Sequence, residues 1–153
     1  MSKPSNLKEA QTRLERYCAL RDRCQFEVQK KLKDWGIIQE AADEILISLI
    51  TQGFVSDERF THAFVRGKFN QNGWGKLKIK SALREKEIPA KMIQEGLDQI
   101  DSEQYFRSLT QLAEKKFKEV KGSNAFEKKG KVFRFLAQRG FESSLIYEAL
   151  NEL

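Results

Sequence analysis

The chain carries one apolar pattern three times. In each copy a leucine follows a branched apolar residue by four positions, precedes a bulky apolar residue by five, and precedes a second leucine by fourteen. These first leucines are Leu32, Leu83 and Leu136. A period of about 50 residues is typical of stacked helical units that bury their apolar faces against one another. The sequence therefore predicts an all-α fold, an elongated tandem array of three three-helix repeats, and such an array favours an extended binding surface over a single catalytic pocket.

Capping signals place the boundaries of these repeats. Ser56 or Asp57 can cap a helix whose first turn also carries Glu58, and a further helix opens at Asp101-Ser102-Glu103. The predicted repeats are therefore residues 1–55, 56–100 and 101–153. Seven large apolar residues that recur at helical spacing are expected in the core: Phe60, Phe64, Leu83, Leu97, Leu136, Phe141 and Leu150.

Residues that tolerate unusual backbone angles indicate where helices end. Gly36 and Gly140 stand where a left-handed residue would close a helix, because glycine has no Cβ to clash. Glu87 occupies the corresponding position of the second repeat, where a left-handed backbone would cost about 1–2 kcal/mol. Cys24 is expected just before a new helix, and Pro89 in the first turn of another.

The composition suits a folded helical protein, with 40% hydrophobic residues, 33% charged residues and only two prolines. The N-terminal residues lead into no apolar segment of the kind found in secretory signals. The longest apolar run, residues 45–50, is far shorter than the roughly 20 residues of a membrane-spanning helix. We therefore expect a cytoplasmic protein without a membrane partner.

Metal and cofactor sites are not indicated. Cys18 and Cys24 are the two cysteines, and His62 is the single histidine. A structural zinc site needs four such ligands at closer spacing. We therefore expect two small half-buried thiols in a reducing compartment, with no metal and no cofactor.

Catalysis is not indicated either. The adjacent carboxylates of Asp57 and Glu58 would point about 100° apart on a helix, which is typical of a capping pair and unsuited to an acid–base couple. The chain contains no recognisable nucleophile–base pair and no glycine-rich phosphate loop. We therefore expect a protein that is not an enzyme.

Positive charge is concentrated in the second and third repeats. The net charge is +6, yet the first 56 residues are close to neutral, with nine bases against eight acids. Between Glu58 and Glu85 there are seven bases and no acid. A second basic stretch covers residues 115–134 and is diluted only by Glu119 and Glu127. This asymmetry favours a polyanionic partner, although a run of lysines is often only a solvated helix face.

Helical spacing selects among these cations. Lys76 and Lys80 lie four positions apart with Arg84 continuing their row, whereas Lys78 would lie on roughly the opposite side. Trp74, between two glycines, is either a loop aromatic folded over the core or an exposed stacking group beside the basic row. The predicted binding surface contains Arg59, Arg66, Lys68, Trp74, Lys76, Lys80, Arg84, Lys128, Lys131, Arg134 and Arg139. Arg139 could equally serve to oppose a helix dipole.

Four short strings, in this order and spacing, resemble the RecX regulatory family over residues 12–153. They are Arg21-Asp-Arg-Cys-Gln-Phe-Glu-Val-Gln-Lys-Lys-Leu32, Ser56-Asp-Glu-Arg-Phe-Thr61, Gly75-Lys-Leu-Lys-Ile79 with Leu83, and Phe135-Leu-Ala-Gln-Arg-Gly-Phe141. Departures are Cys24 for a usual Ser, Thr61 for Ala and Glu87 for Gly. The resemblance implies a non-enzymatic modulator that binds the bacterial RecA recombinase filament on DNA and inhibits its ATPase and strand exchange. We expect a monomer, because nothing in the sequence demands a dimer.

Two other functions remain open from the sequence. Adjacent short helices could form a general DNA-binding protein of helix-turn-helix type, although no repeat gathers Arg, Asn and Gln at one helix N-terminus for base reading. A protein–protein scaffold without nucleic-acid contact is the third possibility.

Overall fold

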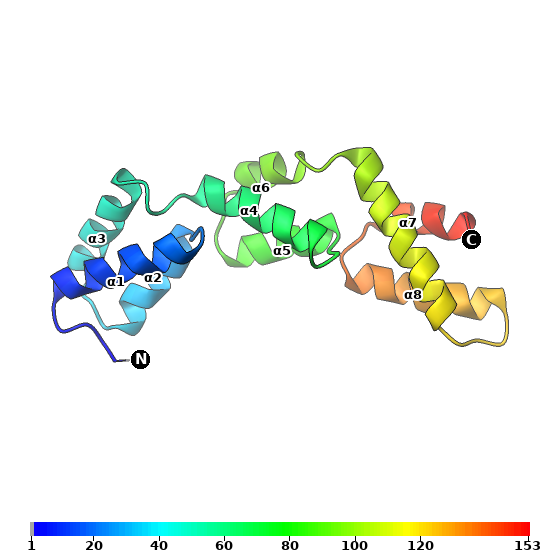
Figure 1. The fold of residues 1–153 in the computed structure, drawn as a ribbon, viewed down its shortest axis with the longest axis horizontal. Helices are drawn as coiled ribbons and strands as arrows, with labels where there is room; N and C mark the ends of the chain where they lie inside the picture. The colour runs from blue at the N-terminus through cyan, green and yellow to red at the C-terminus, as the bar shows by residue number, and fades with distance from the viewer. Residues whose placement is uncertain (1) are drawn as a thin grey trace. The chain divides into compact units, whose positions relative to one another are not determined.

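The computed structural model describes residues 2–153, and within this range every regular element is an α-helix. The helices follow one another in threes, which confirms the predicted all-α array of tandem three-helix repeats (Figure 1). The first repeat contains α1 (Leu7–Leu20), α2 (Gln25–Asp34) and α3 (Gln39–Thr51); the second contains α4 (Asp57–Asn70), α5 (Lys76–Glu85) and α6 (Ala90–Leu97); the third contains α7 (Ser102–Glu119), α8 (Ala125–Gln138) and α9 (Ser143–Asn151).

The chain divides into two compact units. The first unit contains the chain up to Ala63 together with Lys86–Ile88, and the second contains Phe64–Glu85 and Pro89–Leu153. Helix α4 therefore begins in the first unit and ends in the second.

The core of the first unit follows from helical spacing. Ala10, Leu14 and Cys18 recur every four residues on α1 and are all buried. Helices α1 and α2 each pack against α3, whose Ile45 and Leu49 belong to the same cluster. Burial of a leucine of this size contributes about 1.5–3 kcal/mol, so packing on α3 accounts for most of the stability of these short helices.

The capping residues around α4 serve two helices. The Ser56 hydroxyl accepts a hydrogen bond from the Arg59 amide at 3.1 Å and caps α4 as expected. The Asp57 carboxylate instead accepts from the Gln25 amide at 2.8 Å, and thereby caps α2. The predicted capping pair thus includes one residue that acts on a helix 32 positions earlier in the chain. At Cys24 the expected helix start is confirmed, because the Glu27 carboxylate accepts from its amide at 3.2 Å.

An ion pair ties the segment after α5 into the first unit. The Lys86 ammonium lies 3.2 Å from the carboxylate of Glu27, which is 9% exposed. Ile88, two residues further, is buried. Glu27 therefore holds both its own helix start and a segment that is distant in sequence.

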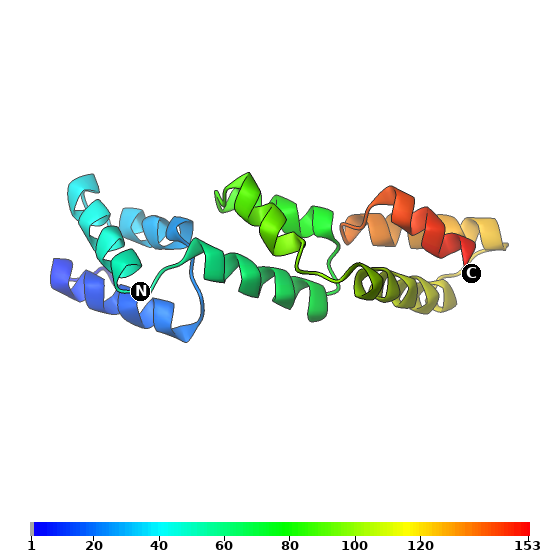
Figure 2. The same ribbon diagram turned by 90° about the horizontal axis from the view of Figure 1, so that it is seen from above.

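In the second unit the third repeat packs most closely. Helices α7, α8 and α9 all pack against one another (Figures 1 and 2). Leu109, Leu136 and Ile146 contribute one fully buried side chain from each helix. Helix α5 packs against α6 in the second repeat.

Most predicted core and backbone positions are confirmed. Gly36, Gly140 and Glu87 all have positive φ, at 71°, 94° and 58°. Two expectations were wrong. Phe64 is half-buried rather than in the core, and its ring packs edge-on against Trp74. Pro89 is the residue just before α6 rather than inside its first turn. The other core predictions are confirmed: Phe60, Leu83, Leu97, Leu136, Phe141 and Leu150 are buried.

The described residues were compared with the expectations for thiols, metal sites and membrane-spanning helices. Cys18 and Cys24 are both buried free thiols, more deeply placed than the half-buried positions expected for them. Across residues 2–153 no group of three metal-ligating side chains comes together. Over the same range, none of the helices has the length and apolar character needed to span a bilayer.

Candidate interaction surface

The start of α5 is fixed by backbone contacts with the turn after α8. The Gly75 amide donates to the Arg139 carbonyl at 2.7 Å, and the Leu77 amide donates to the Gly140 carbonyl at 2.9 Å. A Cβ on Gly75 would lie 2.4 Å from the Gly140 backbone, and one on Gly140 would lie 2.3 Å from the Lys78 Cβ. The two glycines therefore permit a direct backbone contact that supplies partners for α5 amides.

Tyr105 strengthens this contact from the side of α7. Its hydroxyl accepts a hydrogen bond from the Lys76 amide at 2.8 Å and donates to the Glu142 carboxylate. Its ring packs against Phe69 and Phe141, with centroids 5.7 and 5.4 Å away. Burial, followed by donation to Glu142, raises the pKa of Tyr105 well above that of a free tyrosine. The phenol therefore stays protonated and holds the second and third repeats together.

Trp74 lies between the end of α4 and the start of α5, and its ring contacts the ammonium groups of two lysines. The Lys68 ammonium is 4.7 Å and the Lys78 ammonium 4.4 Å from the centre of its ring. The Phe64 ring meets the indole edge-on at 6.3 Å. Ammonium groups over an indole are attracted by its ring quadrupole. Trp74 is half-buried, which places it between the two expectations of a buried loop aromatic and an exposed stacking group.

Among the described residues, most of the cations of α4 and α5 have no carboxylate partner. Within residues 2–153, six of them have no carboxylate at ion-pair distance: Arg66, Lys68, Lys76, Lys78, Lys80 and Arg84. All six belong to the second unit. The local potential on this part of the unit is therefore positive, as the gap in acidic residues predicts.

The predicted row along α5 is only partly exposed. Arg84 is exposed and Lys80 is half-buried, while Ile79 and Leu83 occupy the buried side of the helix. The Lys76 ammonium lies over the Tyr105 ring at 4.9 Å. Lys76 therefore carries a packing role in addition to its charge.

The predicted cations of the third repeat are held by different contacts. The Lys128 ammonium lies 4.1 Å from the Phe117 ring centre. Lys131 donates to the Lys121 carbonyl and lies 3.9 Å from the Glu127 carboxylate. Arg139 donates to the Asn72 carbonyl at 2.6 Å, a contact that bridges the second and third repeats. Lys128, Lys131 and Arg139 are half-buried, and Arg134 is exposed.

Arg59 belongs to the first unit rather than to this cluster. Its guanidinium pairs with Asp22 at 3.0 Å and donates to the Gly53 carbonyl at 2.8 Å. These contacts hold the turn between α3 and α4. The structure thus brings together one region, in which Lys68 and Lys78 lie over the Trp74 ring and Lys76 lies over the Tyr105 ring. Within residues 2–153, Arg66, Lys80 and Arg84 make no hydrogen bond, ion pair or ring contact with it, and Arg59 belongs to a separate part of the chain.

Sequence reasoning missed two members of this region. Lys78 was set aside because it lies opposite Lys76 and Lys80 on α5, yet that side meets Trp74. The four-residue spacing from Trp74 to Lys78 is a signal that could have identified the pair. Tyr105 had no such signal, because its partners lie 29 and 37 positions away in the chain.

Models of known protein families match the second and third helix triplets of this chain. Residues 56–97 match the family model described as RecX, second three-helix domain, and residues 102–150 match the RecX third three-helix domain. Both matched segments coincide with helix triplets of the fold, α4–α6 and α7–α9.

Whole-chain relatives carry the same name. A "Regulatory protein RecX" of Prosthecochloris aestuarii (strain DSM 271 / SK 413) is 30% identical over 149 residues, which cover 97% of this chain and 96% of that protein. Another from Chlorobium phaeobacteroides (strain BS1) is 32% identical over 133 residues, or 87% of this chain and 85% of that protein.

Solved structures agree at the level of the fold. A crystal structure of regulatory protein RecX superposes with a TM-score of 0.85 at 27% identity, covering 96% of this chain and 72% of that one. RecX from Lactobacillus salivarius has the same TM-score at 23% identity and 96% coverage of both chains. The chain therefore belongs to the RecX regulatory protein family.

Proposed function

We propose that this protein is a non-enzymatic regulator that binds the RecA recombinase–DNA filament and inhibits its ATPase and strand-exchange activities. Homologous recombination and DNA repair would then be the processes it modulates. Membership of a family named as regulatory supports a binding role. The observation that carries the proposal is the set of six unpaired cations on α4 and α5.

The proposed contact with the filament is electrostatic. Lysine and arginine side chains without carboxylate partners bind phosphates by releasing counterions, so binding weakens steeply as salt rises. Arg66, Lys80 and Arg84 are the members of this set that make no hydrogen bond, ion pair or ring contact within residues 2–153, and they are the proposed phosphate-binding residues. Trp74, Lys68 and Lys78 form a separate aromatic cluster, because Lys78 lies opposite Lys80 on α5.

Inhibition would follow from the extent and rigidity of the surface. We propose that residues 1–55, 56–100 and 101–153 form three repeats that contact more than one recombinase protomer. A body that spans neighbouring protomers resists the relative movement that ATP turnover requires. The backbone contact between Gly75 and Gly140 supports this proposal, because it stiffens the joint between the second and third repeats.

The rival function, base reading by a helix-turn-helix, is less well supported. Recognition helices place their N-terminal residues against base edges in the major groove. The N-terminal amides of α5 are already bonded to the Arg139 and Gly140 carbonyls, and the Lys76 amide to Tyr105. Helix α5 therefore begins against α7 and the turn after α8, so its N-terminal end has little space to enter the major groove of DNA.

The test combines ATP hydrolysis with charge reversal. The full chain is mixed with RecA filament on single-stranded DNA, and we expect turnover to fall as the chain saturates. The triple variant Arg66→Glu, Lys80→Glu, Arg84→Glu should inhibit less and should reduce the salt slope of binding by about three. Lys91→Glu, an exposed change on α6, is the matched control.

Three results would contradict the proposal. Unchanged ATP turnover at saturating protein rejects inhibition of the filament. Full inhibition by the triple variant, with helical content intact by circular dichroism, favours a scaffold without nucleic-acid contact. Tight, sequence-selective binding to bare duplex near physiological salt would instead favour the helix-turn-helix rival.

A further inference from the structure

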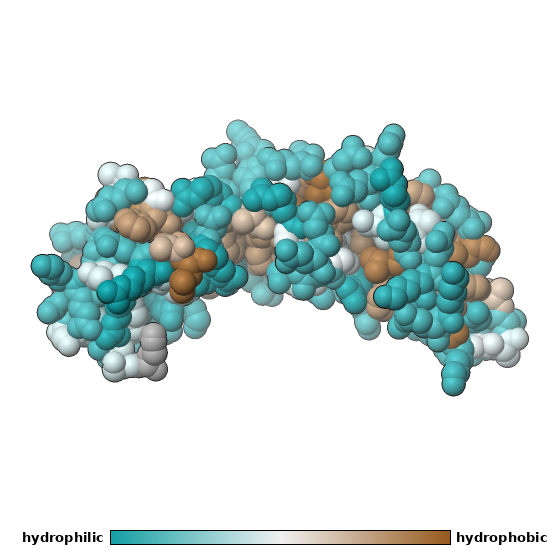
Figure 3. Space-filling view, in the orientation of Figure 1, coloured by the Kyte–Doolittle hydropathy of each residue, from teal (hydrophilic) through white to brown (hydrophobic). Residues whose placement is uncertain are grey.

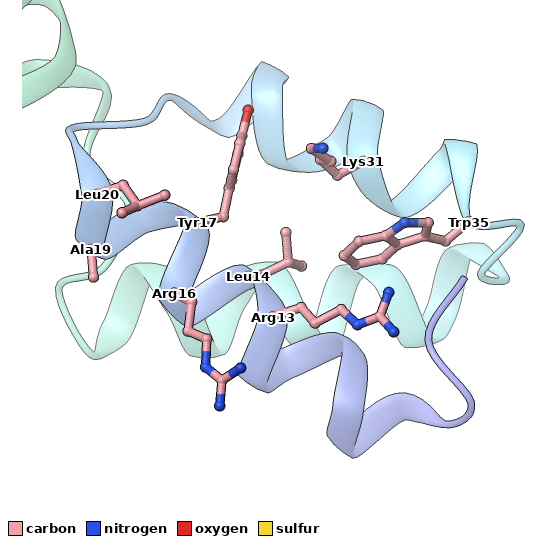
Figure 4. A pocket seen from close by; sticks show the side chains of 8 residues that line it. All are labelled: Arg13, Leu14, Arg16, Tyr17, Ala19, Leu20, Lys31 and Trp35. Carbon is pink, nitrogen blue, oxygen red and sulfur yellow. The ribbon is translucent and has the colours of Figure 1, made fainter. Parts of the chain in front are cut away.

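An apolar groove of about 630 Å³ lies in the first unit, between α1 and α2. Figure 4 shows its floor and walls, with Leu14 at the centre, Tyr17 and Trp35 on either side, and Leu20 near one end. Ala19 completes the apolar lining. Grooves of this size, with apolar walls and a few polar groups at the edge, are typical of ligand and peptide sites.

The groove is open because its two helices are joined through a third. Helices α1 and α2 each pack against α3. At the C-terminal end of α1, Leu20 is 81% exposed. Figure 3 shows brown, apolar surface over this end of α1, bordered by teal, hydrophilic side chains. Exposed apolar surface beside a groove is a common feature of sites that bind a partner.

The edge of the groove is positively charged. Its three charged lining residues are Arg13, Arg16 and Lys31, and none of the lining residues is acidic. Arg13 pairs with Glu9 at 2.6 Å, whereas within residues 2–153 Arg16 and Lys31 have no carboxylate partner. In Figure 4 the Arg16 and Lys31 side chains lie on opposite sides of the opening.

A buried cation adds to this potential. The Arg23 guanidinium lies 3.7 Å above the Tyr17 ring, and its Nε donates to the Tyr17 carbonyl at 3.0 Å. Arg23 is 9% exposed. The Lys31 ammonium lies 5.0 Å from the same ring. With cations over Tyr17, its ring is poorly placed to stack on a nucleic-acid base, so the groove differs in kind from a single-strand binding platform.

We propose that this groove binds a segment of a partner protein that presents bulky apolar side chains next to carboxylates. The apolar side chains would fill the space between Tyr17 and Trp35, and the carboxylates would meet Arg16 and Lys31. Charge complementarity selects this occupant, because the lining combines an aliphatic and aromatic floor with cations alone. The site is a second contact, distinct from the cationic surface of the second unit.

The two tryptophans allow a direct test. Trp35 lines the groove and Trp74 belongs to the second unit, and the chain has no other tryptophan. A short fluorescent peptide with one leucine and one phenylalanine among glutamates is titrated into the full chain, labelled with ¹⁵N at tryptophan. We expect the Trp35 indole signal to shift while that of Trp74 does not. The same peptide with glutamine for glutamate, or serine for the two apolar residues, should bind about tenfold more weakly.

Matched variants test the residues themselves. Arg16→Glu and Leu20→Gln should each weaken peptide binding about tenfold. Lys8→Glu and Leu7→Gln are the controls, because both residues are exposed on α1 and line no part of the groove. All four positions are exposed, so circular dichroism should show the same fold in every variant.

Three results would overturn the proposal. One is equal binding of the acidic and the glutamine peptide, and another is a peptide that leaves the Trp35 signal in place. The third is a shift of Trp35 with vesicles of phosphatidylglycerol and phosphatidylcholine but not with the peptide, which would assign the groove to an anionic lipid surface. These measurements contain no recombinase, so they stand apart from the ATPase test of the proposed function.

Discussion

The crevice between α1 and α2 is open, whereas the one between the corresponding helices α7 and α8 is closed. In the first repeat α1 and α2 each pack against α3, and an apolar groove lies between them. In the third repeat α7 and α8 also pack against each other. The two helix pairs share the same spacing of buried residues, exemplified by Leu14 and Leu109 in α1 and α7.

The difference is explained by helix length and by two phenylalanines. Helix α7 has 18 residues against 14 in α1. Its last turns supply Phe117, whose ring lies under the Lys128 ammonium of α8. Phe135 of α8 lies under Lys116 of α7 at 4.6 Å. One repeat pattern can therefore yield a rigid element in one place and a receptive surface in another.

The largest effect is expected at the joint between the second and third repeats. Gly140→Ala would place a Cβ against Lys78 and strain a backbone with φ of 94°, at a cost of about 2–5 kcal/mol in the free energy of unfolding. Urea unfolding measures the change. In the same region Gly130→Ala, inside α8 with only the flexible Arg134 guanidinium near the added Cβ at 3.8 Å, should instead stabilise by about 0.5–1 kcal/mol. Equal effects of the two changes would show that the joint is not close-packed.

A smaller loss of stability is expected at a tyrosine of the third repeat, Tyr105, than at the glycine joint, and almost none at Tyr17 of the first repeat. Tyr105→Phe removes the acceptor for the Lys76 amide and the donor to Glu142, and should cost about 1–3 kcal/mol. Tyr17→Phe should be close to neutral, because the Tyr17 hydroxyl makes no hydrogen bond within residues 2–153. Thermal and urea unfolding of the two variants would decide the point.

The same phenol predicts a pH dependence. Because the pKa of Tyr105 is raised on folding, its contribution is complete below the pKa of an unfolded tyrosine, about 10. The contribution is lost as the pH rises above that value. The stability difference between the wild-type chain and Tyr105→Phe should therefore shrink at alkaline pH, and a difference that grows there would contradict the assignment.

The closed and the open crevice should also respond differently to truncation. Phe117→Ala should cost about 1–2 kcal/mol, because its half-buried ring fills the contact between α7 and α8. Leu20→Ala, at the edge of the open groove, should change the unfolding free energy by less than about 0.5 kcal/mol. Similar losses at both positions would mean that the groove is already filled.

The smallest effect concerns the thiols of the first repeat. Burial raises the pKa of Cys24 to about 11 and also raises that of Cys18. Both thiols therefore stay protonated near pH 8 and should react with a disulfide reagent far more slowly in the folded chain than in urea. Rapid labelling of the native chain would show that the open groove extends into the core.

Much of the fold followed from local signals. Four-residue spacing of Leu14, Leu32 and Leu136 with their neighbours predicted the helices, because residues one turn apart share a face whatever the rest of the chain does. Gly36 and Gly140 marked helix ends for an equally local reason, the steric freedom of a residue without Cβ.

The sequence also located the positive charge on α4 and α5, since the absence of acids across a segment is itself a local property. What it could not reach were partners set by packing between distant segments. Asp57 caps α2 rather than its own helix, and Lys78 turns toward Trp74. The groove beside Leu14 exists only because α1 and α2 meet on α3. Spacing along the chain determined which face each helix buries, and only the tertiary structure decided which faces meet and which are left open, because that choice depends on contacts between residues far apart in sequence.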